Sequence, residues 1–215
     1  MSSNADGWLW FFVGLLGVVF VVSLAWRLVC KIRCVPWPHW LAFMLENPYM
    51  KLVSPSAEVA RLSGAASGMK VLDLGCGSGR ISEHLCRLVG ESGLIVGVDI
   101  QVPMLEKFVH RMEKVGISNY RAIRADLQEL ETLCEADFDR ILLVTVLGEV
   151  PDQARLVSLA ASKLASSGLL SITEVIPDPC YLTKKHVFEL CASSGLELYS
   201  SSSGLLSYTM NFRKA

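Results

Sequence analysis

The chain has 215 residues, enough for one enzymatic domain with a full hydrophobic core and one further element. Its 20 basic and 21 acidic residues give a formal net charge of -1, which disfavours a polyanionic partner, so no nucleic acid is expected to bind. Hydrophobic residues make up 52% of the chain, which is high for a globular protein. We therefore expect an apolar segment outside the core.

The first element in chain order is an almost uninterrupted apolar run from Trp8 to Trp26. As a helix it would be about 28 Å long, close to the thickness of one hydrocarbon core, with tryptophans at both ends. Basic residues follow on one side only, at Arg27, Lys31 and Arg33. The positive-inside rule then predicts a single-pass membrane protein with its N-terminus outside and its catalytic domain cytoplasmic. A cleaved signal peptide is the alternative, but the start of the chain lacks the basic flank of such a leader.

Three regions follow from this pattern: an anchor with its basic flank over 1–35, an aromatic entry segment with a cap helix over 36–69, and a catalytic domain over 70–215. The entry segment carries Trp37 and Trp40 among several prolines. It fits a short helix lying in the membrane interface, and it fits equally a segment that packs its aromatic rings on the catalytic domain. Both alternatives stay open.

From residue 70 onward, segments with the pattern of strands alternate with segments with the pattern of helices, which predicts a parallel sheet covered on both faces. The expected strands are 70–74, 94–99, 120–124, 138–146 and 169–175, the expected helices are 54–63, 79–89, one from 103, 152–165 and 182–193, and a hairpin pairs 196–202 with 205–212. The expected fold class is α/β: a Rossmann-like, doubly wound, mostly parallel seven-stranded sheet with an antiparallel C-terminal hairpin, preceded by one transmembrane helix.

A glycine-rich turn follows the first expected strand, with Gly75, Gly77 and Gly79 at alternate positions before a helix. Glycine permits a tight turn and lets a ligand approach the backbone, while a helix N-terminus favours an anionic group. The dinucleotide-binding fingerprint requires a glycine at the sixth position of this loop. This chain has Arg80 there, so the spacing excludes a dehydrogenase. Asp99, 20 residues past Gly79, can accept hydrogen bonds from both hydroxyls of a ribose.

The sequence DLGCGSG after two apolar residues resembles the first motif of class I S-adenosylmethionine-dependent methyltransferases, and the resemblance extends from about residue 36 to the end. It implies S-adenosylmethionine as cofactor and S-adenosylhomocysteine as product. The cofactor-binding positions that it implies are Asp73, Gly75, Cys76, Gly77, Gly79, Asp99, Ile100, Asp126 and Leu127. The glycine loop and Asp73 would hold the methionine part, and Asp99 would hold the ribose. The adenine would lie against Ile100 and Leu127 with its amine at Asp126, for which a solvated helix cap is the alternative.

The segment ILLVTVLGEVPD resembles quinone-biosynthesis methyltransferases, in which a histidine commonly stands where this chain has Gly148. A general base must then come from elsewhere. Glu149 is the candidate catalytic residue, with His39 and His186 as alternatives, unless the acceptor ionises unaided as a thiol can. Glu149 also fits an exposed or helix-capping carboxylate. Glu174 is expected to face the substrate side, because ligand sites of this architecture lie at the carboxyl ends of the strands.

No metal site is expected, because Cys134, Cys180 and Cys191 lack the paired spacing of zinc ligands. A thiol cluster of the arsenite-methylating kind would require folding to bring them together. The leading hypothesis is methylation of a lipophilic or membrane-associated small molecule, such as a lipid headgroup, a quinone or a thiol. The alternatives are a soluble small-molecule acceptor with the helix as a location tag, and an inactive cofactor-binding membrane scaffold.

Overall fold

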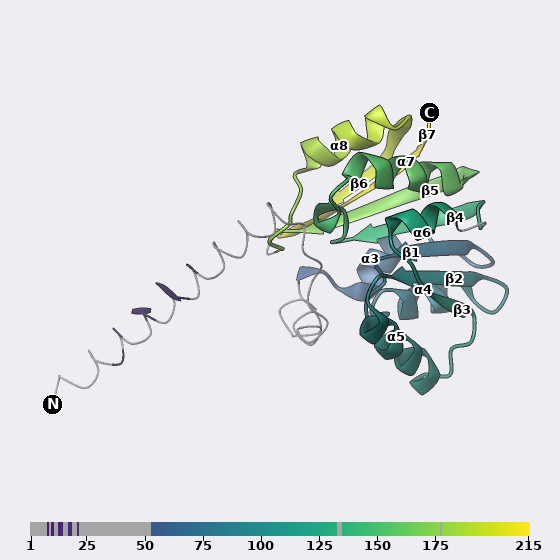
Figure 1. The fold of residues 1–215 in the computed structure, drawn as a ribbon, viewed down its shortest axis with the longest axis horizontal. Helices are drawn as coiled ribbons and strands as arrows, with labels where there is room; N and C mark the ends of the chain where they lie inside the picture. Colours follow the sequence, from purple (N-terminus) through teal and green to yellow (C-terminus); the bar gives the residue numbers. More distant parts are fainter. Residues whose placement is uncertain are drawn as a thin grey trace.

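A seven-stranded sheet in the order β3-β2-β1-β4-β5-β7-β6 forms the centre of the fold (Figure 1). The structure is a computed structural model that describes residues 53–132, 135–176 and 178–215, together with scattered positions between residues 8 and 21. The strands are β1 (Lys70–Leu74), β2 (Leu94–Asp99), β3 (Tyr120–Arg124), β4 (Phe138–Val144), β5 (Leu164–Val175), β6 (Leu196–Ser203) and β7 (Ser207–Lys214).

The first five strands are parallel to one another, and β7 adds to β5 in the antiparallel direction. β6 then pairs with β7 at the edge, so the predicted C-terminal hairpin and mixed sheet are confirmed. The central strands β1 and β2 are buried on both faces, which explains why their sequences are almost continuously apolar. Parallel strands end at one edge of a sheet, and the loops at that edge build the site described below.

Helices cover both faces of the sheet (Figure 1). They are α3 (Ser56–Leu62), α4 (Ser82–Val89), α5 (Val102–Lys114), α6 (Leu127–Thr132), α7 (Gln153–Lys163) and α8 (Lys184–Ser193), with a 3-10 turn η2 (Leu147–Glu149) after β4. Val71 packs with α3, α4 and α5 in one core, and its neighbour Leu72 packs with α6, α7 and α8 in the other. Successive strand residues point to opposite faces, so the doubly wound arrangement is confirmed.

The structure differs from the expected elements mainly around β5. The sequence from Ser166 to Gly168 predicts the end of a helix, whereas the helix α7 ends at Lys163 and β5 begins at Leu164. The pairing of β4 with β5 shifts register between Phe138 and Arg140, so these small residues accommodate an irregularity within the sheet instead of ending a helix. The short helix α6 has no counterpart among the expected elements.

The predicted membrane span, Trp8–Trp26, lies largely outside the described residues, and so does the entry segment as far as residue 52. Within the part of the chain that the structure describes, no helix is both long and apolar enough to cross a membrane. The described chain resumes at Val53, and α3 contributes Val59 and Ala60 to the same core as α4 and α5. The cap helix thus packs as part of the catalytic domain.

Candidate active site

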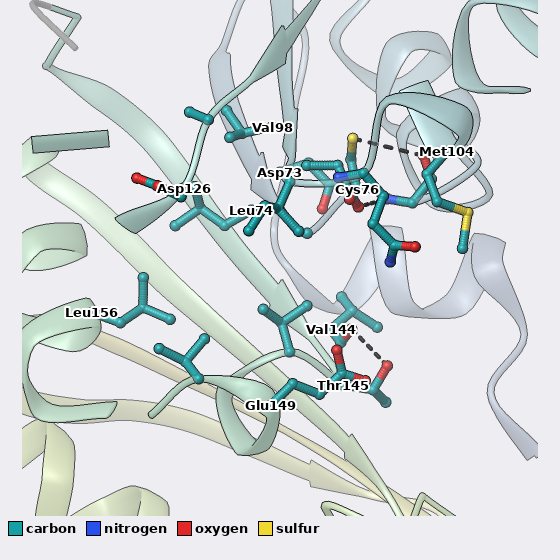
Figure 2. A pocket seen from close by; sticks show the side chains of 18 of the residues that line it. Asp73, Leu74, Cys76, Val98, Met104, Asp126, Val144, Thr145, Glu149 and Leu156 are labelled. Carbon is teal, nitrogen blue, oxygen red and sulfur yellow. Dashed lines mark hydrogen bonds between the residues drawn. The ribbon is translucent and has the colours of Figure 1, made fainter. Parts of the chain in front are cut away.

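A cavity of about 660 Å³ opens at the carboxyl ends of the parallel strands. Figure 2 shows its two walls: Asp73, Cys76 and Met104 lie on one side, and Thr145 and Glu149 lie on the other. The first wall consists of the loops after β1 and β2, and the second is the segment after β4. A cavity of this size falls within the range that small-molecule ligands and cofactors occupy in proteins.

The glycine loop after β1 has a distinct reason for each of its three glycines. All three have positive φ angles: 70° at Gly75, 54° at Gly77 and 77° at Gly79. A Cβ on Gly75 would lie 2.3 Å from Cγ2 of Val146, and one on Gly79 would lie 2.7 Å from Cδ2 of Phe108. A Cβ on Gly77 would meet nothing within 4 Å. Gly77 therefore gives a ligand open access to the backbone, whereas Gly75 and Gly79 are required by packing.

Seven of the positions that the resemblance implies border the cavity together with the candidate base. The structure brings Asp73, Gly75, Cys76, Gly77, Asp99, Ile100, Asp126 and Glu149 to its surface. Gly79 is not among the bordering residues, because it faces the ring of Phe108 instead. The side chain of Leu127 lies outside what the structure describes, and the residue is the first of α6.

Asp73 is buried at the end of β1 and accepts a hydrogen bond from the hydroxyl of Ser82 in the first turn of α4. Burial raises the pKa of Asp73 to about 6, and repulsion from Asp99 adds to this effect. The hydrogen bond from Ser82 acts in the opposite direction. Asp73 therefore ties β1 to the helix that follows the glycine loop while one side of it borders the cavity.

Asp99 connects the ends of β1 and β2. Its Oδ2 accepts a hydrogen bond from the amide of Gly77 at 2.9 Å, and its Oδ1 accepts one from the amide of Gln101 at 2.8 Å. Burial raises the pKa of Asp99, whereas these backbone hydrogen bonds lower it. Each carboxylate oxygen can accept more than one hydrogen bond, so the side chain keeps acceptor capacity on the cavity side.

Asp126 stands at the beginning of α6 and has the geometry of a reciprocal helix cap. Its Oδ1 accepts from the amide of Glu129 at 2.9 Å, and its own amide donates to Oε2 of Glu129 at 2.8 Å. The helix-cap alternative for Asp126 is thus present in the structure, and the residue also borders the cavity. Capping fixes the carboxylate in place, which is compatible with a second role toward a ligand.

Cys76 places its sulfur in the interior of the glycine loop, where only 8% of the residue is exposed. Burial raises the pKa of its thiol, and the carboxylates of Asp73 and Asp99 raise it further. The thiol is therefore neutral at physiological pH. Its contribution to the site is packing and shape rather than nucleophilic attack.

Gly148 has a steric explanation that the sequence did not suggest. A Cβ at this position would lie 1.9 Å from the carbonyl oxygen of Cys180, so no other residue fits without moving the backbone. At this point η2, which follows β4, packs directly against the loop that follows β5. The neighbouring Glu149 is the titratable residue of η2 that borders the cavity.

Thr145 is a cavity residue that the sequence analysis missed. It has a φ of 54°, which a β-branched side chain rarely adopts and which stores backbone strain. Its amide donates to the carbonyl of Thr173 at 2.9 Å, and its hydroxyl donates to the carbonyl of Val144 at 2.7 Å (Figure 2). No sequence signal marks this position, because the strain arises from the turn between β4 and η2.

Glu174 does not border the cavity, contrary to the expectation from topology. It is only 1% exposed, its Oε2 accepts from the amide of Leu182 at 3.2 Å, and its Oε1 has no hydrogen-bond partner. Burial raises its pKa to about 8, with further contributions from Asp178 and Glu149. Glu174 is therefore protonated at neutral pH and lies behind the wall that Glu149 and Asp178 form.

The remaining candidates do not converge on the cavity. Nε2 of His186 lies 2.9 Å from Oε1 of Gln153 on the surface, while His39 and Cys134 lie outside the described residues. Cys180 and Cys191 are buried and free. Within the described residues, no three histidine, cysteine or acidic side chains are grouped so that they could hold a metal ion.

Comparison with known proteins places this geometry among methyltransferases. Residues 65–198 match the methyltransferase domain family. The arsenite methyltransferase of Aquipseudomonas alcaligenes is 31% identical over 154 residues, which cover 66% of this chain and 43% of that protein. The ubiquinone/menaquinone biosynthesis C-methyltransferase UbiE of Haemophilus ducreyi is 31% identical over 113 residues, 52% of this chain and 43% of that protein. The chain therefore spans less than half the length of these curated relatives.

Solved structures show the same fold. A SAM-dependent methyltransferase from Aquifex aeolicus superimposes with a TM-score of 0.74 at 18% identity, covering 82% of this chain and 98% of that one. The arsenic(III) S-adenosylmethionine methyltransferase CrArsM from Chlamydomonas reinhardtii superimposes with a TM-score of 0.57 at 21% identity, covering 83% and 73%. At these identities the likeness establishes the architecture and leaves the acceptor open.

Proposed function

The chain belongs to the methyltransferase domain family, and on this premise we propose that it transfers a methyl group from S-adenosylmethionine to a lipophilic or membrane-associated small molecule. The observation that carries the proposal is the cavity in which the open backbone at Gly77 and the carboxylate of Asp99 lie side by side. S-adenosylmethionine would lie along this wall.

The residues of this wall fit the cofactor. The empty space above Gly77 admits a ligand to the backbone, and Asp99 can accept from ribose hydroxyls while it holds the loop. Ile100 is 46% exposed beside it and offers an apolar surface to an adenine ring. Asp73 and Asp126 border the same cavity, where they would meet the amino group and the adenine amine.

Bound S-adenosylmethionine supplies a methyl group that is already activated on a sulfonium, so the protein must align an acceptor and, where needed, remove its proton. We assign the second task to Glu149, which borders the cavity from the wall opposite the glycine loop (Figure 2). Thr145 lies beside it and fixes the turn that presents this wall.

An apolar cavity supports the lipophilic nature of the acceptor. Between the polar groups, the lining consists mainly of aliphatic side chains and methionine, namely Leu74, Ile81, Met104, Leu130, Val144, Val146, Val150 and Leu156. Such a surface gains free energy when it removes apolar ligand atoms from water.

The single-pass anchor, with the N-terminus outside and the domain cytoplasmic, is part of the same proposal. Two observations support it: the apolar run of the sequence, and the helical conformation and exposure of the described positions within that run. Trp8, Trp10, Val18 and Val21 are helical, and between 61% and 71% of each is exposed. Exposed apolar side chains on a helix are costly in water and stable in lipid.

The test is to incubate detergent-solubilised protein with methyl-labelled S-adenosylmethionine and a total cell extract, and then to separate organic from aqueous phases. The Asp99→Ala variant serves as the blank. Label in the organic phase is the expected result, and it directs mass spectrometry to the acceptor. Label confined to the aqueous phase would reduce the helix to a location tag, and no transfer in either phase would leave an inactive membrane scaffold.

A further inference from the structure

The β6–β7 turn carries the most exposed large hydrophobic side chain of the described residues, Leu205, which is 93% exposed. The turn is held in a defined shape, because the amide of Gly204 donates to the carbonyl of Ser207 at 2.8 Å. The amide of Ile176, the residue after β5, donates to the carbonyl of Leu206 at 2.7 Å. Leu205 therefore projects from a fixed turn beside the carboxyl end of β5, at the same end of the strands as the cavity.

Further apolar side chains lie along the same edge. Ile176, after β5, is 43% exposed, and Ile100 and Val102, after β2, are 46% and 52% exposed. The cavity opens between these two groups, because it is built from the ends of β1, β2 and β4. Ile100 lines the cavity itself, so we call the set formed by Val102, Ile176 and Leu205 the apolar rim. A rim of this kind around a cavity mouth is expected where a protein meets an apolar partner.

The described chain also begins at this edge. The hydroxyl of Ser207 donates to the carbonyl of Val53 at 3.0 Å, so the first residue of the domain is bound to the β6–β7 hairpin. The 52 residues that precede Val53 include the apolar run Trp8–Trp26 and its basic flank. The segment that joins the run to the domain therefore leaves from the side that carries the rim.

A tether alone does not orient a domain. The proposed anchor brings the domain near a membrane, but by itself it does not set which side of the domain faces the lipid. A contact between the rim and the membrane would set this orientation. Lys184 donates to the hydroxyl of Ser203 beside the turn, and the neighbouring Lys185 is highly exposed. Lys185 also pairs with Glu189 at 3.9 Å, and the two lysines place positive charge beside the turn, which favours anionic headgroups while the leucine enters the interface.

We propose that the apolar rim is a bilayer-contacting surface: Leu205 and Ile176 insert at the headgroup level and turn the cavity mouth toward the membrane. This inference rests on the anchoring proposed above. A lipophilic acceptor then has a short path from the bilayer to the cavity, because the rim lies at the same end of the strands as the cavity.

The test places one environment-sensitive fluorescent amino acid at position 205 of the full chain, reconstituted in nanodiscs of phosphatidylcholine with phosphatidylglycerol. The matched control carries the same amino acid at position 88. Leu88 is also exposed, at 39%, but it lies near the C-terminal end of α4, where Val89 accepts from Gly68 at the opposite edge of the sheet. Both sites are on the surface, so neither replacement removes core packing.

A lipid-borne quencher is expected to act about threefold or more strongly on position 205 than on position 88, and a water-soluble quencher should show the reverse order. Equal accessibility to the water-soluble quencher, with the protein retained in the nanodiscs, would overturn the contact and leave the anchor standing. A position 205 shielded from both quenchers would mean that protein covers the rim, which also contradicts the proposal. Loss of the chain from the nanodiscs would remove the anchor and the contact together, while methyl transfer in detergent would still be measurable.

Discussion

The amide of Gly77 donates a 2.9 Å hydrogen bond to Oδ2 of Asp99, so the loop after β1 and the end of β2 form one unit. This bond orients both groups that the proposed cofactor needs: an open stretch of backbone and a carboxylate. Because the amide is satisfied by the carboxylate before any ligand arrives, the wall is organised in advance, which lowers the cost of binding.

Replacement of Glu149 tests its assignment as general base. Glu149→Gln should lower kcat by about 10²–10⁴-fold for an acceptor that loses a proton, and it should leave the affinity for S-adenosylhomocysteine unchanged. Isothermal titration and a pH profile of turnover measure both effects. Asp152→Asn is the control, since Asp152 borders the same cavity but caps α7 by accepting from Arg155. Equal loss in both variants, or an unaffected Glu149→Gln, would remove the assignment.

Gly148→Ala should destabilise the fold, because the new methyl group would meet the carbonyl of Cys180, which is backbone and cannot turn away. We expect a loss of about 1–3 kcal/mol in the free energy of unfolding, measured by urea denaturation. The matched control is Gly204→Ala, where the nearest atom is the side-chain hydroxyl oxygen of Ser207 at 3.0 Å instead of a backbone oxygen at 1.9 Å. If Gly148→Ala and Gly204→Ala were equally tolerated, the close contact would not govern this position.

Thr145→Gly should relieve backbone strain and still impair the site. Glycine adopts the positive φ without a Cβ penalty, and after its larger entropy in the unfolded chain is subtracted we expect a gain of about 0.5–1 kcal/mol in stability. Turnover should fall, because the wall that carries Glu149 loses its fixed turn. Asp137→Gly is the control: Asp137 has a similar φ of 58°, but it does not border the cavity. Lower stability of Thr145→Gly with full turnover would contradict this account.

Glu174 should make the protein less stable as the pH rises. Its folded pKa of about 8 exceeds its ordinary value of 4.5, so the stability from the neutral carboxyl is complete below pH 4.5 and is lost progressively up to about pH 8. Asp73, with a pKa of about 6, adds to the acidic part of this trend. Glu174→Gln should raise stability at pH 8 by on the order of 3 kcal/mol and flatten the curve.

Urea denaturation at several pH values between 4 and 9 gives this curve, with Glu197→Gln on the exposed strand β6 as control. If Glu174→Gln and the unsubstituted protein kept parallel curves, the buried carboxyl would not be the cause. The turnover of Glu174→Gln is a separate readout, and an unaffected rate would remove any catalytic role for this residue.

The sequence predicts the strands 70–74, 94–99 and 120–124 residue by residue, because each carries the periodicity and flanking turns of a strand. It also predicts the glycine loop and Asp99, since a functional turn of this kind depends on residues that are adjacent in the chain. The contact between Gly148 and Cys180 lies beyond such reasoning, because it joins two loops that are far apart in sequence. For the same reason, the sequence alone suggests a missing histidine at this position.

Gly79 and Glu174 show that the sequence does not predict in which direction a residue points. Both stand next to the cavity in sequence and topology, but Gly79 packs on Phe108 and Glu174 is buried behind the wall. Sequence spacing assigns a residue to an edge of the sheet, whereas the direction of its side chain depends on the packing of helices from elsewhere in the chain. The register shift within β5 is likewise decided by its pairing with β4.

Titration of S-adenosylhomocysteine into the purified full chain, followed by calorimetry, tests most directly whether the cavity is a cofactor site. The unsubstituted protein should bind one equivalent, and Asp99→Ala should bind about tenfold more weakly or worse, since the ribose acceptor and the bond to Gly77 are lost together. Glu91→Ala, an exposed change outside the cavity, should leave the affinity unchanged. Absence of binding by the folded, unsubstituted chain, or equal affinity in Asp99→Ala, would contradict the proposed site.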